Sequence, residues 1–200
     1  ISNPEGAKAK LYLQTRGLSD QTIEDFKLGY APDAWSALLD HLKTQFNEGF
    51  LDKAGLVMAG KEGRYYDRFR KRIIFPILDI KGNSVAFGAR VLDDSLPKYL
   101  NSPETEIYTK GRHLYGLYQA RTAIRDEDAV AVVEGYMDVI GCYQAGVKNV
   151  VASLGTALTT DQVRMIKRHT HNVYMLYDAD AAGEMATLRG LELFLEEGLE

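Results

Sequence analysis

The sequence predicts an α/β protein in which an α+β part comes first and a part with a mainly parallel sheet follows. In the second part, short runs of small and β-branched residues alternate with segments of helical pattern, and the connections are short. This alternation favours parallel strands joined by right-handed crossovers. In the first part, helical segments precede a strand, a tight turn and a returning strand. We therefore expect two domains, residues 1–125 and residues 126–200.

The first part is expected to begin with four short helices. Gly17 can end the first helix, Ser19 can cap the second, and Asp33 can cap the third. The apolar face of the third helix would consist of Trp35, Leu38, Leu39 and Leu42. The four expected helices cover residues 7–15, 19–26, 34–46 and 48–54.

Strands are expected at residues 73–80 and 84–91, around a turn at residues 81–83. Residues 92–116 show little periodicity, and a long irregular segment in a compact chain is usually functional or mobile. A helix over residues 117–124 leads into the second part. There we expect strands at 129–133, 149–152 and 173–177, and helices at 136–145, from Thr159 or Thr160 to about 169, and at 183–197.

Charge is unevenly distributed along the 200 residues. Residues 1–125 hold 19 Lys and Arg against 15 Asp and Glu, whereas residues 126–200 hold 5 against 13. A basic half would suit a bound polyanion, and an acidic half would suit bound metal ions. The alternative is that both halves are ordinary solvated surface.

No apolar run approaches the ~20 residues that span a bilayer. The single Cys142 permits no internal disulfide, fits a reducing cytoplasm, and is interpreted as core.

Residues 64–72 combine basic and aromatic side chains. Basic side chains bind phosphates and aromatic rings stack on unpaired bases, so the segment is typical of single-strand binding. The alternative is a solvated edge strand protected by its charges. The basic members are Arg64, Arg68, Arg70, Lys71 and Arg72, and the aromatic ones are Tyr65, Tyr66 and Phe69.

Three acidic residues follow predicted strands of the second part. Glu134 comes where one strand stops, and Asp178 and Asp180 follow another strand about forty residues later. If the two strands are parallel neighbours, these carboxylates meet at the edge of the sheet where α/β proteins build their sites. Crowded carboxylates require neutralisation, and Mg²⁺ or Mn²⁺ prefers such oxygen ligands. Taken alone, two aspartates separated by one residue are also common on surfaces.

These residues resemble a known family. Residues 133–139 (Val-Glu-Gly-Tyr-Met-Asp-Val) and 177–183 (Tyr-Asp-Ala-Asp-Ala-Ala-Gly) are similar to the Toprim domain, which primases, topoisomerases and certain nucleases share. Glu-Gly-Tyr-Met-Asp, together with residues 97–105 (Pro-Lys-Tyr-Leu-Asn-Ser-Pro-Glu-Thr), resembles the bacterial DnaG-type primase core more specifically. So do residues 68–70, 75–77, 88–90, 110–117 and 152–156, so that the resemblance runs from about residue 7 to the end of the chain.

The resemblance implies the core of a DNA-directed RNA polymerase that makes short primers on single-stranded DNA from ribonucleoside triphosphates. Glu134 would act in general acid/base catalysis or bind metal, Asp178 and Asp180 would bind Mg²⁺ or Mn²⁺, and Asp138 would complete the catalytic set. The alternative for Asp138 is capping or bonding a basic neighbour. Positions implied to bind template, nucleotide or the RNA–DNA hybrid are Arg68, Arg70, Arg90, Lys98, Asn101 and Lys110.

The chain departs from the family pattern in several places. Ala179 stands where the family usually has Gly, and a further acidic motif is expected beyond Glu200. A zinc-binding module before the core and a helicase-binding module after it are also expected outside these residues. The chain is therefore interpreted as a fragment of a cytoplasmic, nucleoid-associated bacterial protein, and whether it polymerises alone is left open. The alternatives are another Toprim protein, such as a topoisomerase or nuclease subunit, or a non-catalytic single-stranded DNA-binding fragment.

Overall fold

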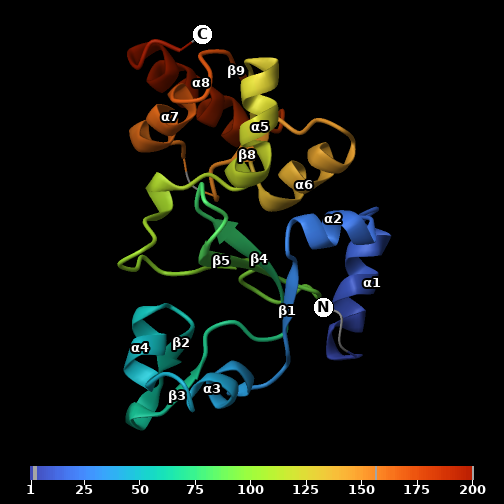
Figure 1. Cartoon of the computed structure of the whole chain (residues 1–200), viewed down its shortest axis with the longest axis vertical. Helices are drawn as coiled ribbons and strands as arrows, with labels where there is room; N and C mark the ends of the chain where they lie inside the picture. The colour runs from blue at the N-terminus through green and yellow to red at the C-terminus, as the bar shows by residue number, and fades with distance from the viewer. Residues whose placement is uncertain (2–3, 156, 200) are drawn as a thin grey trace. The chain divides into compact units, whose positions relative to one another are not determined.

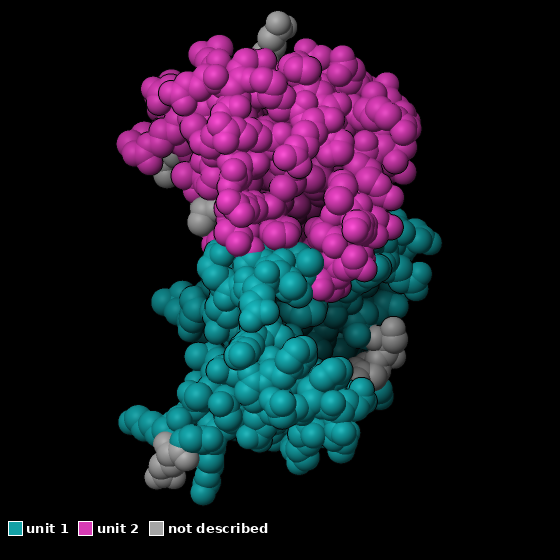
Figure 2. All heavy atoms as spheres, turned by 60° about the vertical axis from the view of Figure 1, so that its left-hand side comes forward, with its two compact units in different colours: residues 1–76, 85–108 teal, residues 77–84, 109–200 magenta. Residues whose placement is uncertain are grey.

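The computed structural model describes residues 1, 4–155 and 157–199. Spatial contacts divide the chain into two compact units, coloured separately in Figure 2. Unit 1 comprises residues 1–76 and 85–108, and unit 2 comprises residues 77–84 and 109–200. Because this division interrupts a hairpin, the domain boundary near residue 125 stays a prediction.

The described residues of unit 1 form a four-stranded sheet of order β1-β4-β5-β6, a two-stranded sheet of β2 and β3, and the four short helices α1 to α4. Figure 1 shows their arrangement. The predicted hairpin is β4 and β5. The strands β1 and β6 were not predicted, because three residues are too few to show alternation. The bounds are α1 Ala7–Thr15, α2 Asp20–Asp25, β1 Gly29–Ala31, α3 Ala37–Leu42, α4 Glu48–Lys53, β2 Val57–Ala59, β3 Tyr65–Asp67, β4 Arg72–Leu78, β5 Ser84–Val91 and β6 Tyr99–Asn101, with 3₁₀ turns η1 Pro4–Gly6 and η2 Lys61–Gly63.

The predicted third helix begins later than expected, and Asp33 does not cap it. Helix α3 starts at Ala37, and its free N–H groups are capped from elsewhere in the chain. The carboxylate of Asp67, 2% exposed at the end of β3, accepts the backbone N–H of Leu38 (2.7 Å) and of Leu39 (2.9 Å). The late start leaves Trp35 outside the helix and 67% exposed, so its predicted place on the apolar face is wrong.

Replacing Asp67 with Ala should lower the free energy of unfolding by about 1–3 kcal/mol, because two N–H groups at the start of α3 lose their acceptor. Asp33→Ala is the matched control, since that carboxylate caps no helix and its removal should be nearly neutral. Chemical denaturation of both variants measures the difference. Equal stability of the two would contradict the capping role.

Unit 2 is built around three parallel strands in the order β8-β7-β9, which confirms the predicted parallel sheet. Val133 pairs with Ala152 and Val132 with Met175 in the register of the sheet. Helices α5 and α6 pack against β8, and α7 packs against α8 (Figure 1). The bounds are η3 Lys110–Arg112, α5 Leu117–Glu127, β7 Val130–Val133, α6 Tyr136–Gln144, β8 Val150–Ala152, α7 Thr160–Lys167, β9 Val173–Met175 and α8 Ala181–Glu196.

The core cluster of unit 2 joins strands β7 and β8 to helices α5, α7 and α8. The strand residues contribute β-branched side chains that pack well on a pleated surface. The buried cluster includes Ile124, Val130, Val132, Val151, Val163 and Phe194. This packing fixes the strands, and hence the residues that follow them at the carboxyl edge.

The predicted end of strand β9 and the predicted start of helix α8, which lie on either side of Asp178 and Asp180, are both wrong. Strand β9 ends at Met175 rather than Tyr177, and α8 begins at Ala181 rather than Gly183. The side chain of Asp180 accepts the backbone N–H of Gly183 (2.8 Å) and caps the helix two residues early. None of the helices in the described part of the chain has the length and apolar character that a membrane crossing requires.

Candidate active site

Glu134 and Asp178 meet at the carboxyl edge of the parallel sheet. Glu134 follows the last residue of β7, and Asp178 lies three residues after the end of β9, the neighbouring strand. The backbone N–H of Asp178 donates to Oε1 of Glu134 at 2.8 Å. Both side chains are exposed. The predicted convergence of the two strand ends is therefore present in the structure.

Asp138 lies in the first turn of α6, next to the same edge. Its Oδ2 accepts the backbone N–H of Gly135 at 2.9 Å, so it caps the helix, as one of the two interpretations of the sequence expects. Partial removal from water raises the pKa of the Asp138 carboxyl; the Gly135 hydrogen bond opposes this, and the charge of Asp178 adds to it. Asp138 is therefore close enough to Asp178 for the charge of Asp178 to act on it.

The Asp138 carboxyl should therefore titrate above the ordinary aspartate value of 3.8. Because the folded-state pKa is raised, protonation of Asp138 stabilises the fold; this contribution is present below the unfolded pKa and is lost as the pH rises through the folded pKa. Carboxyl-detected NMR over an acid titration measures the midpoint. Asp178→Asn removes the repulsion and should move the midpoint down. A wild-type midpoint at or below 3.8 would contradict the assigned environment.

Asp180 and Glu134 line one cavity of about 480 Å³. Ser153, which follows β8, and Tyr177 line the same cavity. Burial raises the pKa of the Tyr177 hydroxyl, a hydrogen bond with Ser153 lowers it, and the charge of Glu134 raises it further. Residues that follow all three strands therefore line this one cavity: Glu134 after β7, Ser153 after β8 and Tyr177 after β9.

The acidic residues have the oxygen ligands that Mg²⁺ and Mn²⁺ prefer. Glu134, Asp138 and Asp180 each accept one backbone N–H, from Asp178, Gly135 and Gly183. Across residues 1, 4–155 and 157–199, however, no three His, Cys, Asp or Glu side chains form a ready metal site. The donor chemistry fits a divalent ion, and the ligand set of Glu134, Asp178 and Asp180 stays a prediction.

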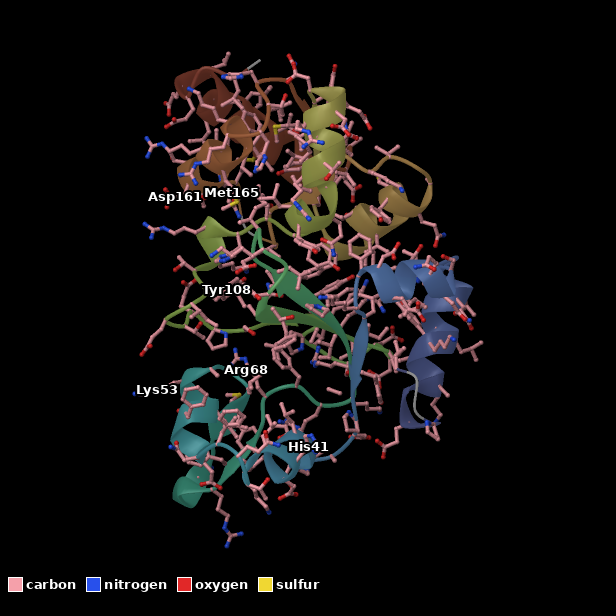
Figure 3. All side chains as sticks on the ribbon, in the orientation of Figure 1. His41, Lys53, Arg68, Tyr108, Asp161 and Met165 are labelled. Carbon is pink, nitrogen blue, oxygen red and sulfur yellow. The ribbon has the colours of Figure 1, made fainter. Side chains whose placement is uncertain are left out.

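Of the basic residues in unit 1, Arg68 is half-buried (labelled in Figure 3). Its Nη2 donates to the backbone carbonyl of Asn101 at 3.2 Å, which joins two positions predicted to bind nucleic acid. Burial lowers the pKa of the Arg68 guanidinium, and the charge of Asp52 opposes that shift. Arg68 therefore holds β6 in place, and its guanidinium is only partly available to a ligand.

Arg70 lies against two aromatic rings. Its guanidinium is 4.2 Å from the ring centre of Trp35 and 5.0 Å from that of Tyr66, and it donates to the carbonyl of Asp67. The exposed Trp35 belongs to this group and was missed, because the sequence placed it on the buried face of a helix. An aromatic residue next to a basic run was the available signal.

Arg90 and Lys98 border one cavity of about 420 Å³, together with Tyr12 and Arg16. Arg90 is only 8% exposed; its guanidinium lies 4.8 Å from the ring centre of Tyr12, and Nη1 donates to the Val91 carbonyl at 3.1 Å. Lys98, by comparison, is exposed. Arg90 and Lys98 were both predicted to bind nucleic acid, but only the Lys98 side chain is freely accessible to a ligand.

Lys110 lies in unit 2, in the 3₁₀ turn η3, where its backbone carbonyl accepts a hydrogen bond from Gln162. A buried cation that the assignment of binding residues omitted is Arg72, 9% exposed, whose Nη1 donates to the Pro97 carbonyl at 2.9 Å. Arg72 supports the segment before Lys98 from inside the fold, a role that only the tertiary structure reveals.

Comparison with models of protein families identifies the family to which this chain belongs. A model described as the DNA primase catalytic core, N-terminal domain, matches residues 1–121, and a Toprim domain model matches residues 128–200. The chain belongs to the DNA primase catalytic-core family. The resemblance to primase core and Toprim domain is confirmed.

Two relatives illustrate the extent of the similarity to DNA primases. The DNA primase of Clostridium acetobutylicum is 50% identical over 197 residues, which are 97% of this chain and 32% of the relative. The DNA primase of Escherichia coli K12 is 45% identical over 196 residues, 98% of this chain and 34% of the relative. The chain thus spans about a third of the length of these primases.

Solved primase structures share the fold. A DnaG primase catalytic domain bound to ssDNA is 44% identical, with a TM-score of 0.89 over 96% of this chain and 62% of that one. The Aquifex aeolicus primase, comprising zinc-binding and RNA polymerase domains, is 38% identical, with a TM-score of 0.90 over 100% of this chain and 49% of that one. The predicted fold class is confirmed.

Proposed function

We propose that this chain is part of the catalytic core of a DNA primase, which synthesises short RNA primers on single-stranded DNA from ribonucleoside triphosphates. The observation that supports it most is the hydrogen bond between Glu134 and the backbone of Asp178. It joins acidic residues from two neighbouring parallel strands in a chain of the primase family. The parallel pairing of β7 and β9 brings these two residues together at the edge of the sheet.

In this proposal Glu134, Asp178 and Asp180 hold Mg²⁺ or Mn²⁺. The ion would lower the pKa of the attacking 3′-hydroxyl and stabilise charge on the phosphates and the leaving pyrophosphate. The protein contributes position: Asp178 orients the Glu134 carboxylate, and Asp180 is fixed as the cap of α8. Asp138 stabilises the start of α6 and adds negative charge beside Asp178. Glu134 is the general base or a metal ligand.

Template binding is assigned to the basic residues of unit 1. A similar structure is described as a primase catalytic domain bound to ssDNA, and we extend this partner to the present chain. Lys98 and Arg70 would contact phosphates, whereas Arg68 and Arg90 would mainly support the surface, given their burial. Asn101 and Lys110 would bind the nucleotide or the RNA–DNA hybrid. Sequence discrimination would come from base pairing.

In the whole protein, the core would work in the bacterial cytoplasm at the nucleoid. A zinc-binding module and a module that binds the replicative helicase would accompany it. Zinc belongs to that separate module in this proposal, and Mg²⁺ or Mn²⁺ to the core.

Template-directed incorporation of labelled ribonucleotides by a full-length primase that contains these residues tests the function. We expect short RNA products that require single-stranded DNA and a divalent ion. Strand cleavage or relaxation of supercoiled DNA without RNA synthesis would favour another Toprim activity. Single-strand binding without any reaction would favour a binding fragment.

A further inference from the structure

The cavity next to Glu134 contains one basic residue that the proposed mechanism does not use. Arg189 lines this cavity of about 480 Å³ together with Glu134, Asp180, Met185 and other residues. The remaining lining is apolar or uncharged: Ser153, Gly155, Ala157, Tyr177, Gly183 and Ala186. The cavity therefore combines two carboxylates and one guanidinium.

Arg189 reaches the cavity because of its position on α8. Arg189 follows Met185 by four residues and Ala186 by three, so the three side chains lie on one face of the helix. Helical side chains lean toward the N-terminus of their helix, and that end of α8 carries Asp180. The same helix thus presents a carboxylate at its cap and a guanidinium more than two turns later to a single space.

Arg189 is exposed, and among the described residues it makes no ion pair or side-chain hydrogen bond. This separates it from Arg164 and Arg112, which pair with Glu197 and Asp161. A guanidinium that neutralised Glu134 or Asp180 would be within ion-pair distance of one of them. Its five donors are therefore available to a ligand that enters the cavity.

We propose that Arg189 binds the phosphate oxygens of the incoming nucleoside triphosphate. This inference rests on the proposed primase function and assigns a binding role to one residue of the same site. Guanidinium groups bind phosphates through two parallel hydrogen bonds, and a triphosphate has enough oxygens to reach both the carboxylates, where a divalent ion would bind, and Arg189. Glu134 and Asp180 would hold a divalent ion that neutralises part of the triphosphate charge, and Arg189 would bind phosphate oxygens through its own N–H donors. The released pyrophosphate would keep the same contact.

Steady-state primer synthesis by a full-length primase that contains these residues tests the assignment. Arg189→Ala should raise KM for the nucleotide about tenfold and weaken product inhibition by pyrophosphate by a similar factor, since the variant cannot make the charge-assisted hydrogen bonds to phosphate. The dissociation constant for single-stranded DNA should stay unchanged. Arg189→Lys, which keeps the charge and loses the two-pronged geometry, should fall between. Arg125→Ala is the matched control, because Arg125 is exposed, pairs with Asp126 and does not line the cavity.

The outcomes separate the two proposals. If the wild-type protein makes no RNA, the proposed function fails and the assignment of Arg189 fails with it. If the wild type is active but Arg189→Ala keeps its nucleotide KM and pyrophosphate inhibition, only the assignment fails. If Arg189→Ala instead weakens template binding and leaves pyrophosphate inhibition intact, Arg189 binds a template phosphate, and the proposal is overturned. Circular dichroism and thermal unfolding of each variant confirm that the fold is retained.

Discussion

Replacing Glu134 with Gln should reduce primer synthesis by on the order of 100-fold to 1,000-fold, because the site loses a charge that acts where charge develops in the reaction. The substitution keeps the size of the side chain. The Gln carbonyl can still accept the Asp178 N–H that Glu134 accepts at 2.8 Å, so the register of the strand ends should survive. The effect should therefore appear in kcat and in metal dependence, with the thermal unfolding temperature unchanged.

Glu127→Gln is the matched control for this experiment. Glu127 is an exposed residue at the end of α5 and does not line the cavity next to Glu134, so its variant should make RNA at the wild-type rate. Initial rates at saturating template and nucleotide, across a range of Mg²⁺ and Mn²⁺ concentrations, compare the two variants. Synthesis by Glu134→Gln at the wild-type rate would remove Glu134 from the mechanism.

Lys98→Ala and Arg90→Ala should have different effects, although the sequence treats the two residues alike. Lys98 is exposed, so its removal should weaken binding of single-stranded DNA to the same degree for every sequence. The slope of the logarithm of the binding constant against the logarithm of the salt concentration should become shallower by about 0.7 for each phosphate that is no longer neutralised.

Arg90 is packed beside the rings of Tyr12 and Tyr99, so its removal should lower the free energy of unfolding by about 2 kcal/mol.

Fluorescence anisotropy with labelled oligonucleotides over a salt series measures the first effect, and chemical denaturation measures the second. Lys148→Ala, an exposed lysine stacked on Tyr143 of α6, serves as the charge control. An unchanged affinity and salt slope for Lys98→Ala would remove Lys98 from the binding surface. Wild-type stability of Arg90→Ala would contradict its structural role.

The sequence predicted the acidic residues because strand ends can be recognised locally. The apolar run before Glu134 and the run before Asp178 mark two strands, and parallel pairing places their carboxyl ends together. The structure adds the specific bond between Glu134 and the Asp178 backbone. That bond depends on the backbone path after β9, which apolar patterning does not encode.

Caps and cation environments could not be predicted in the same way. Asp67 caps α3 from about thirty residues away, so no local capping pattern exists, and the nearer Asp33 was chosen wrongly. The burial of Arg90 and Arg72 likewise depends on rings and carbonyls supplied by distant segments. Sequence identifies which residues carry charge, whereas packing decides which of these charges a ligand can reach.

Titration of the chain with Mn²⁺, followed by NMR, tests the acidic cluster most directly. A bound paramagnetic ion broadens the signals of nearby amides, and the N–H groups of Gly135, Asp178 and Gly183 donate to the Asp138, Glu134 and Asp180 carboxylates, respectively. We predict that these three amide signals broaden first, at low ratios of Mn²⁺ to protein, and that Glu134→Gln weakens the effect. Broadening that begins elsewhere, or that is uniform along the chain, would contradict a divalent-ion site at the carboxyl edge of this sheet.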